Sequence, residues 1–456
     1  MTIEEQEPEF HKHLSKFSCL MIGIGGLIGG GIFSVIGVIS AFTGPYSYLS
    51  YVITGIVALI TVYSYQKLTL KWGDPGGEYT CVQNAFYNSK LQNLGPFIGI
   101  LLFFGYIVTM ALYAYTFSIY FILMFNVRYS FYLIAIIIVV LIFILMILNL
   151  KGVKESARVQ GILVIVYSCI FLIFIILGIS FTMQNPERMI TNVGLDGKSI
   201  TNINIIGIVL GSSCILISYE GFQLIAYGSH EMDDKEGGLK MMKWAVIFAM
   251  IIYYLVGFTT MAVLGVSEII SEDAHNAEVS IALAALISIG ILGMFLIIFG
   301  ALLSTTSALN ATMLGSSRLA YMMAKDEVLP QKISKINKNK VPFISIITTG
   351  IISIILALFT GGALAIAGLA GLIFAQIFFI INLTNFKVRK VTGSNAILPI
   401  TGMILTSSFF SILLFYSFIN FDQEIYSLLS FFIMEAATIF FVFHIKRRNG
   451  NLKNKN

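Results

Sequence analysis

The sequence predicts an all-α membrane protein of twelve transmembrane helices. Three observations support this fold class: the composition, the apolar segments and the placement of the basic residues. Of 456 residues, 57% are apolar and 11% are charged, and the mean hydropathy is +0.89. Because soluble domains carry about 25% charged residues, this chain has too few polar groups to cover so apolar a core. The composition therefore excludes a soluble enzyme, a disordered chain and a nucleic-acid binder, and the net charge of +5 does not indicate phosphate recognition.

Twelve apolar segments bounded by charged residues predict the membrane spans. They lie near 17–42, 46–66, 95–125, 130–149, 159–182, 203–229, 241–265, 279–317, 342–360, 363–385, 397–419 and 425–445. The third and eighth are longer than a perpendicular span requires, so we expect these helices to tilt or to project beyond the bilayer. Residues 1–16 and 446–456 are expected to form short tails, and the first apolar stretch is too long and glycine-rich for a cleavable signal peptide.

The basic residues predict the orientation of the helices. Of the 28 lysines and arginines, all but Arg128, Arg188 and Lys198 fall in the two tails or in loops predicted on the same side. Loops rich in lysine and arginine stay in the cytoplasm, so both termini are expected there, in a multi-pass protein of the cell membrane. The four cysteines show no paired spacing, and we expect them to be free thiols without a functional role.

Two acidic residues lie at bilayer depth, Glu220 and Glu435. A carboxylate at mid-membrane costs about 2.5–3.5 kcal/mol on insertion scales, so such residues are candidates for function. Glu435 lies in an unbroken apolar segment, and we interpret it as a neutral, hydrogen-bonded or oligomer-facing residue. Glu220 stands beside Gly221 in the middle of the sixth span, where an interrupted helix favours a functional site; a glutamate that only forms a hydrogen bond between helices is the alternative.

Glycines interrupt the first span. Six of the nine residues from Gly23 to Gly31 are glycine, although each costs up to about 1 kcal/mol relative to alanine in a helix. Consecutive Gly29, Gly30 and Gly31 favour a local unwinding in which backbone amides and carbonyls face a cavity. Close packing of helices through small residues is the alternative interpretation.

The interrupted first and sixth spans each begin a set of five. Since five is an odd number, the sets 17–182 and 203–385 have opposite topologies, and the spans within 397–445 lie outside this 5+5 inverted repeat. Broken helices at matching positions of two inverted halves are typical of the substrate site of a transporter, near the middle of the membrane.

Five segments together carry a resemblance to a known family. They are residues 27–33 (LIGGGIF), 74–79 (DPGGEY), 149–160, 218–222 (SYEGF) followed by Glu231, and 316–342. In order and spacing they resemble the first span, the loop after the second, the start of the fifth, the sixth and the 8–9 loop of the amino acid–polyamine–organocation permeases. That family shares the leucine-transporter fold, and the resemblance extends from the first span to about the ninth.

The resemblance implies a secondary active transporter that moves amino acids by alternating access. Amides of the three consecutive glycines would bind the substrate carboxylate, and carbonyls near Leu27 and from Ile217 to Glu220 would bind its ammonium group. Ile217 stands where relatives often place an aromatic gate, while Phe222 and Gln223 would line the side-chain pocket. The expected substrate-binding residues are Leu27, Ile28, Gly29, Gly30, Gly31, Ile217, Ser218, Glu220, Phe222 and Gln223.

The coupling ion is a separate question. Many relatives that co-transport protons carry a lysine in the fifth span at the position of Tyr167, which would face Thr312 of the eighth span. A neutral tyrosine supplies no cation, so sodium binding there, a proton carried elsewhere and exchange all remain open. Glu220 is the other candidate proton carrier, because burial favours the neutral carboxylic acid, and it could equally neutralise a cationic substrate. We expect a proton rather than sodium, and no cofactor or metal.

Other classes fit the sequence less well. An ion channel would need a repeated filter loop or an arginine ladder, a membrane enzyme an intramembrane His or Cys–His cluster, and a nutrient sensor a large soluble tail; none is present in the sequence. The absence of a Walker motif argues against ATP drive within this chain. An exchanger and a transporter of polyamines or other cationic substrates remain alternatives. The expected partners are an amino acid substrate and membrane lipid, without nucleic acid or an obligate protein partner.

Overall fold

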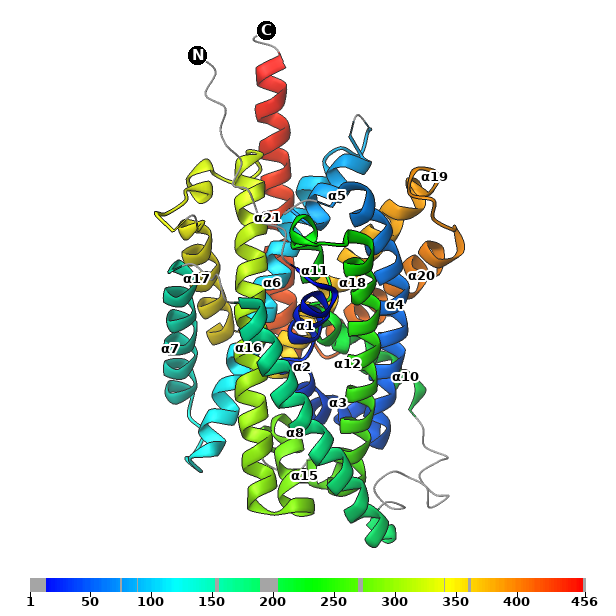
Figure 1. The fold of residues 1–456 in the computed structure, drawn as a ribbon, viewed down its shortest axis with the longest axis vertical. Coiled ribbons are helices and arrows are strands. Elements are labelled where there is room, and N and C mark those ends of the chain that lie inside the picture. Colours follow the sequence, from blue (N-terminus) through cyan, green and yellow to red (C-terminus); the bar gives the residue numbers. More distant parts are fainter. Residues whose placement is uncertain are drawn as a thin grey trace.

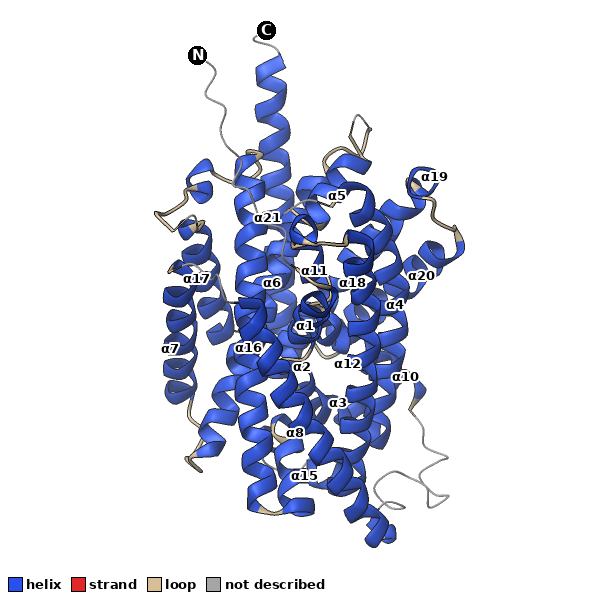
Figure 2. Cartoon of the chain, in the orientation of Figure 1, coloured by secondary structure: helices blue, strands red, loops and turns tan. Residues whose placement is uncertain are grey.

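The computed structural model describes residues 14–73, 76–87, 89–151, 156–188, 204–269, 274–339, 341–359 and 362–453. Within these ranges the chain forms helices and connecting loops, together with one isolated β-bridge between Leu14 and Met232 (Figure 2). The prediction of an all-α protein is confirmed. Parts of the prediction lie outside the described residues: the tail up to residue 13, Asp74, Pro75 and Lys198.

The helices follow the chain in the order that Figure 1 shows by colour. They are α1 (Lys16–Leu27), α2 (Gly30–Phe33), α3 (Val35–Thr43), α4 (Ser47–Trp72), α5 (Glu78–Ala85), α6 (Leu94–Met124), α7 (Phe131–Leu150), α8 (Ser156–Gln184), α10 (Ile205–Cys214), the 3-10 helix η3 (Ile215–Tyr219), α11 (Leu224–Tyr227), α12 (Lys235–Leu264), α13 (Val266–Ile269), α14 (Ala274–Glu278), α15 (Ser280–Ile289), α16 (Ile291–Lys325), α17 (Phe343–Phe359), α18 (Ala363–Lys387), α19 (Arg389–Thr392), α20 (Ile397–Ile419) and α21 (Phe421–Lys453).

Eleven helical segments of the described chain are long and apolar enough to cross a membrane. Each overlaps a different predicted span, although the second segment, Val35–Trp72, also includes the end of the predicted first span. The remaining predicted span, the ninth, corresponds to α17, whose 17 residues stand at the lower limit for a transmembrane helix. The chain is therefore a multi-pass membrane protein, while the count of twelve spans stays a prediction.

The structure differs from the predicted boundaries in two places. The predicted eighth span, 279–317, is not one long tilted helix but two helices, α15 and α16, which meet at Gly290 with a φ of +89°. Gly290 lies inside a continuous apolar run, so hydropathy gave no sign of the break. At the other end of the chain, the expected tail from residue 446 continues α21 as helix through Lys453.

The arrangement of the helices separates a protein core from a lipid-facing shell. Figure 1 shows the short α1 and α2 in the middle of the molecule, with α7 and α20 at opposite edges. In α6, 89% of the most apolar window is buried, against 28% in each of α7, α20 and α21. The peripheral helices expose large apolar side chains such as Phe143 and Phe415, as expected where the solvent is lipid.

The two broken helices touch each other through their backbones. Between η3 and α11 the chain turns at Gly221, whose φ of +132° is one that residues with a side chain rarely adopt. A Cβ atom added at Gly221 would lie 2.5 Å from the carbonyl oxygen of Gly26 and 2.6 Å from the nitrogen of Leu27. Glycine is therefore required here twice, by the backbone angle and by the contact.

Replacement of Gly221 by alanine tests this contact. Backbone strain of this kind costs about 1–3 kcal/mol, and the overlap with Gly26 adds to it, so we expect Gly221→Ala to lower the melting temperature of the detergent-solubilised protein by several degrees. Gly393→Ala is the matched control, because Gly393 also has a positive φ (+64°) but nothing within 4 Å of the added atom. Equal losses in the two variants would show that the helix contact contributes nothing.

Candidate functional site

The first broken helix leaves three backbone amides without acceptors. Helix α1 ends at Leu27, Ile28 and Gly29 are non-helical, and α2 begins at Gly30. The described hydrogen bonds give acceptors to the amides of Ile28 and Ser34, but to none of the amides of Gly29, Gly30 and Gly31. This agrees with helix geometry, since the first amides of a helix have no partner within it. The predicted unwinding is present, and the free donors suit an anionic group.

Close packing also accounts for these glycines. A Cβ atom at Gly29 would lie 2.8 Å from the Cβ of Ala308 in α16, and one at Gly30 would lie 2.7 Å from the hydroxyl oxygen of Thr116 in α6. At Gly31 it would overlap Ser218 of η3. The packing interpretation and the unwinding interpretation therefore both hold, since the chain has room here for backbone alone.

Tyrosine hydroxyl groups donate hydrogen bonds to several backbone carbonyls of the two broken helices. The hydroxyl of Tyr253, in α12, lies 2.5 Å from the carbonyl oxygen of Leu27 and 2.9 Å from that of Ser218, and so bridges the two broken helices. Further hydroxyl groups donate to the first broken helix: Tyr51 to Gly31 O at 2.8 Å, Tyr120 to Phe33 O at 3.1 Å and Tyr113 to Gly26 O at 3.3 Å.

Tyr253 is the residue of this site that the sequence reasoning missed. The carbonyls of Leu27 and Ser218, predicted to bind an ammonium group, are bound by its hydroxyl group in this structure. A tyrosine inside an apolar span gives a weak signal, because tyrosine also packs as an aromatic side chain. The folded structure shows that Tyr253 belongs to a set of buried tyrosines. Among the described residues, nine of the twelve largest fully buried side chains are tyrosines.

Glu220 lies at the junction of the two broken helices. It follows η3 in an extended conformation (φ −75°, ψ 135°) and is fully buried. Its Oε1 accepts a hydrogen bond of 3.3 Å from the amide of Gln223, whose own oxygen accepts from the backbone N–H of Gly221 at 3.0 Å. Its Oε2 has no hydrogen-bond partner, so the carboxyl group retains capacity for a proton or a ligand.

The other predicted residues of the second broken helix have distinct surroundings. Ser218, next to Gly31, has a buried hydroxyl oxygen without a hydrogen-bond partner, and the carbonyl of Ile217 accepts the N–H of Glu220 at 3.2 Å. The ring of Phe222 instead packs on Tyr65 of α4 and on Phe378 of α18, with ring centres 5.1 and 5.9 Å away. Its pocket-lining role stays a prediction.

The predicted ion-coupling pair is not joined in the structure. The hydroxyl group of Tyr167 lies 3.5 Å from the carbonyl oxygen of Ile24 in α1, the limit of a hydrogen bond, and its ring packs edge-on against Phe171. Thr312 is buried in α16 with a hydroxyl oxygen that has no partner. No described hydrogen bond connects the two side chains. In the described part of the chain, no group of three or more His, Cys, Asp or Glu residues could hold a metal ion.

Glu435, the other acid at bilayer depth, is half-buried and accepts a hydrogen bond of 2.8 Å from the side chain of Gln376 in α18. The interpretation of a hydrogen-bonded residue is confirmed. It lies in α21, which belongs to the lipid-facing shell rather than to the broken helices.

Further polar contacts join helices that surround the broken ones. On one side Glu278, at the end of α14, accepts from the hydroxyl group of Tyr115 in α6 and from the backbone N–H of Ala363 in α18, both at 3.2 Å. On the other side the hydroxyl group of Tyr79 in α5 donates to Asp326, just after α16, at 2.8 Å. Side chains thus connect separate helices on both sides.

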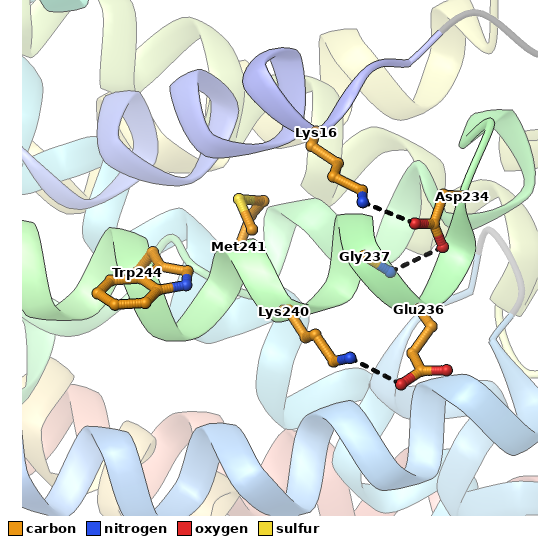
Figure 3. A pocket seen from close by; sticks show the side chains of 7 residues that line it. All are labelled: Lys16, Asp234, Glu236, Gly237, Lys240, Met241 and Trp244. Atoms are coloured by element: carbon orange, nitrogen blue, oxygen red, sulfur yellow. Dashed lines mark hydrogen bonds and ion pairs between the residues drawn. The ribbon is translucent and has the colours of Figure 1, made fainter.

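The surface also has a small cavity of about 260 Å³ between the starts of α1 and α12 (Figure 3). Lys16 pairs there with Asp234 at 2.9 Å, and the Gly237 amide together with the Lys16 ammonium group lowers the pKa of the Asp234 carboxyl. The two charged side chains are more than half exposed, so the pair stabilises the fold little. The cavity lies at the far end of α1 from Leu27, where the break begins, and none of its lining residues belongs to the candidate site.

Comparison with known proteins identifies the class. A family model described as amino acid permease matches residues 14–455, and the chain belongs to this family. It is thus a membrane transport protein and not an enzyme.

Individual relatives are similar over most of the chain. "Uncharacterized protein MJ0609" of Methanocaldococcus jannaschii is 27% identical, over 93% of this chain and 93% of its own length. The methylthioribose transporter of Bacillus subtilis is 24% identical (77% and 76%), and the branched-chain amino acid permease BcaP of the same organism is 23% identical (74% and 73%).

The role of Tyr253 is tested by Tyr253→Phe. The variant leaves two buried carbonyls without their donor, at a cost of about 1–3 kcal/mol, so we expect a lower melting temperature of the substrate-free protein. If substrate ammonium binds the same carbonyls, a saturating mixture of L-amino acids should raise the melting temperature more in this variant than in the wild type. Tyr254→Phe, one residue along α12, is the control. An equal ligand-induced shift in all three proteins would contradict this assignment.

Proposed function

We propose that the protein is a secondary active transporter that takes up amino acids by alternating access and is driven by a proton gradient. The observation that carries this proposal is the junction of the broken helices. There the unpaired amides of Gly29, Gly30 and Gly31 and the buried carboxyl group of Glu220 are held by the contact between Gly26 and Gly221. The positive-inside pattern supports an orientation with both termini in the cytoplasm, in the cell membrane.

The backbone supplies the recognition. The free amides bind the substrate carboxylate, and the carbonyls of Leu27 and Ser218 bind its ammonium group once the hydroxyl group of Tyr253 moves aside. Every amino acid carries these two charged groups on one carbon, so this part of the site selects the class and leaves the side chain to the surrounding helices. The similarity to the branched-chain amino acid permease BcaP of Bacillus subtilis supports this class of substrate.

Glu220 carries the coupling proton. A buried carboxyl group with one free oxygen exists in a neutral and a charged form, and substrate binding beside it shifts the balance between them. The contacts of Glu278 close the outer end in the proposed orientation, and the Tyr79–Asp326 pair closes the inner end. Alternate opening of these two closures moves the substrate and the proton across together.

An exchanger of cationic amino acids is the second candidate. The free oxygen of Glu220 suits a positively charged side chain as well as a proton, and one relative, 24% identical over 77% of this chain and 55% of its own length, is the vacuolar cationic amino acid transporter 2 of Arabidopsis thaliana. Under this alternative, uptake needs substrate on the opposite side and no proton gradient.

Gradient-driven uptake by the wild type separates the two candidates, and replacement of Glu220 by glutamine tests its role as proton carrier. In liposomes of purified protein, an inwardly directed proton gradient should drive saturable uptake of a mixture of radiolabelled L-amino acids by the wild type. Glu220→Gln should reduce this uptake by at least about tenfold, because the amide carries no exchangeable charge. Glu435→Gln, the other acid at bilayer depth, should transport as the wild type does. Gradient-driven uptake with an unchanged pH dependence in Glu220→Gln would show that Glu220 is not the proton carrier.

A further inference from the structure

A second buried carboxyl group, Glu78, lies outside the site described so far. It is the first residue of α5, in the connection between α4 and α6, and only 2% of it is exposed. Glutamate in a loop at a membrane surface normally points into water. Here Gly77, with a φ of +55°, turns the chain so closely against Tyr227 that an added Cβ would lie 2.8 Å from its ring. The acid is thereby held beneath a buried tyrosine.

Tyrosine hydroxyl groups connect Glu78 with the core. Tyr227, at the end of α11, donates to Oε2 of Glu78 at 2.9 Å, and Tyr106 of α6 donates to the hydroxyl oxygen of Tyr227 at 3.0 Å. The order of donors is fixed, because a carboxylate can only accept, so Tyr227 must donate to it and receive from Tyr106. Both O–H bonds therefore point from the membrane core toward Glu78.

Glu220 lies near the Tyr106 end of this series of hydrogen bonds. Thr109, one turn beyond Tyr106 along α6, lies beside the Glu220 carboxyl group. The two carboxyl groups also interact electrostatically with each other. Each retains one oxygen without a hydrogen-bond partner.

We propose that Glu78 is a second proton-binding site, which receives the coupling proton from Glu220 through the hydroxyl groups of Tyr106 and Tyr227 and releases it on the cytoplasmic side. This inference rests on the proposed function. In the transfer, the carboxylic acid of Glu220 first turns to within hydrogen-bond distance of Tyr106. Its O–H bond then breaks and its proton binds the oxygen of Tyr106. The former proton of Tyr106 passes to Tyr227, and that of Tyr227 passes to Oε2 of Glu78. Glu220 is left ionised, Glu78 becomes neutral, and neither tyrosine changes its charge.

The surroundings of Glu78 suit a group that binds and releases a proton near neutral pH. Burial raises the pKa of Glu78 from 4.5 to about 7, and the hydrogen bond from Tyr227 opposes this rise. Two described charged side chains contact other residues of the α5 region. Asp326 accepts from Tyr79, and Lys387 of α18 lies over the ring of Phe86, 3.7 Å from its centre, at the far end of α5.

The test measures net uptake and exchange on the same liposomes of full-length protein. Net uptake of radiolabelled L-amino acids under a proton gradient, with the internal pH followed by a dye, needs proton release inside. Exchange of the same amino acids across the membrane without a gradient needs no net proton movement. We expect Glu78→Gln to reduce net uptake and the accompanying acidification at least tenfold, and to reduce exchange far less. Tyr106→Phe, which interrupts the chain but keeps the Tyr227–Glu78 bond, should lower the same ratio of net uptake to exchange.

Two controls make the outcome decisive. Tyr79→Phe removes the Tyr79–Asp326 contact but leaves the hydrogen bonds between Tyr106, Tyr227 and Glu78 intact. It should keep the wild-type ratio of net uptake to exchange. A parallel loss of both activities in Glu78→Gln, or a normal ratio in Tyr106→Phe, would overturn the proposal and leave Glu78 as a closing contact. The wild type decides the proposed function separately, since uptake without acidification there excludes proton coupling itself.

A stability measurement checks that Glu78 titrates in the folded protein. Its pKa is higher in the folded than in the unfolded chain, so the folded state binds the extra proton between about pH 4.5 and 7 and loses stability as the pH rises through that window. The melting temperature of Glu78→Gln relative to the wild type should therefore rise from pH 4.5 to 7 and stay constant above. A difference that does not depend on pH would contradict a titrating Glu78.

Discussion

The candidate site depends on one contact, between the backbone of Gly221 and the backbone of Gly26 and Leu27. Two helices can approach this closely only where neither carries a side chain, and Gly221 adopts a φ that favours glycine as well. The contact holds the ends of both breaks together. It places Ser218 against Gly31 and brings the carbonyls of Leu27 and Ser218 within reach of one hydroxyl group.

In the unwound backbone several carbonyls have hydrogen-bond partners and three glycine amides do not, and this difference determines what the site can bind. An unpaired polar group in a membrane interior costs several kcal/mol, so non-helical backbone survives there only with partners. Carbonyls of both breaks have tyrosine hydroxyl donors, whereas the amides of Gly29, Gly30 and Gly31 have no acceptor. These unpaired amides can therefore bind an anionic group without first losing another partner. An ammonium group must compete with a hydroxyl group already in place.

The sequence predicted the parts of this structure that leave a local signal. Apolar segments located the helices, the glycine run located the first break, and the pair Glu220–Gly221 located the second. It missed what long-range packing decides. Gly290 separates α15 from α16 without any change in hydropathy, and Tyr253 of α12 binds carbonyls of both broken helices. In the sequence Glu78 resembles any acidic residue of a loop, and only the structure shows that Tyr227 contacts it and that it is buried.

The two buried acids also explain why a tyrosine-rich core suits this protein. A hydroxyl group both donates and accepts, so it can satisfy a carbonyl, as Tyr253 does, or pass a hydrogen bond onward, as Tyr227 does between Tyr106 and Glu78. A lysine in these positions would carry a fixed charge and would hold both carboxyl groups ionised. Neutral tyrosines bring no fixed cation to Glu220 and Glu78, which suits the proposed passage of a proton between them. Tyr167 fits the same pattern, since it brings a hydroxyl group and no charge to the carbonyl of Ile24.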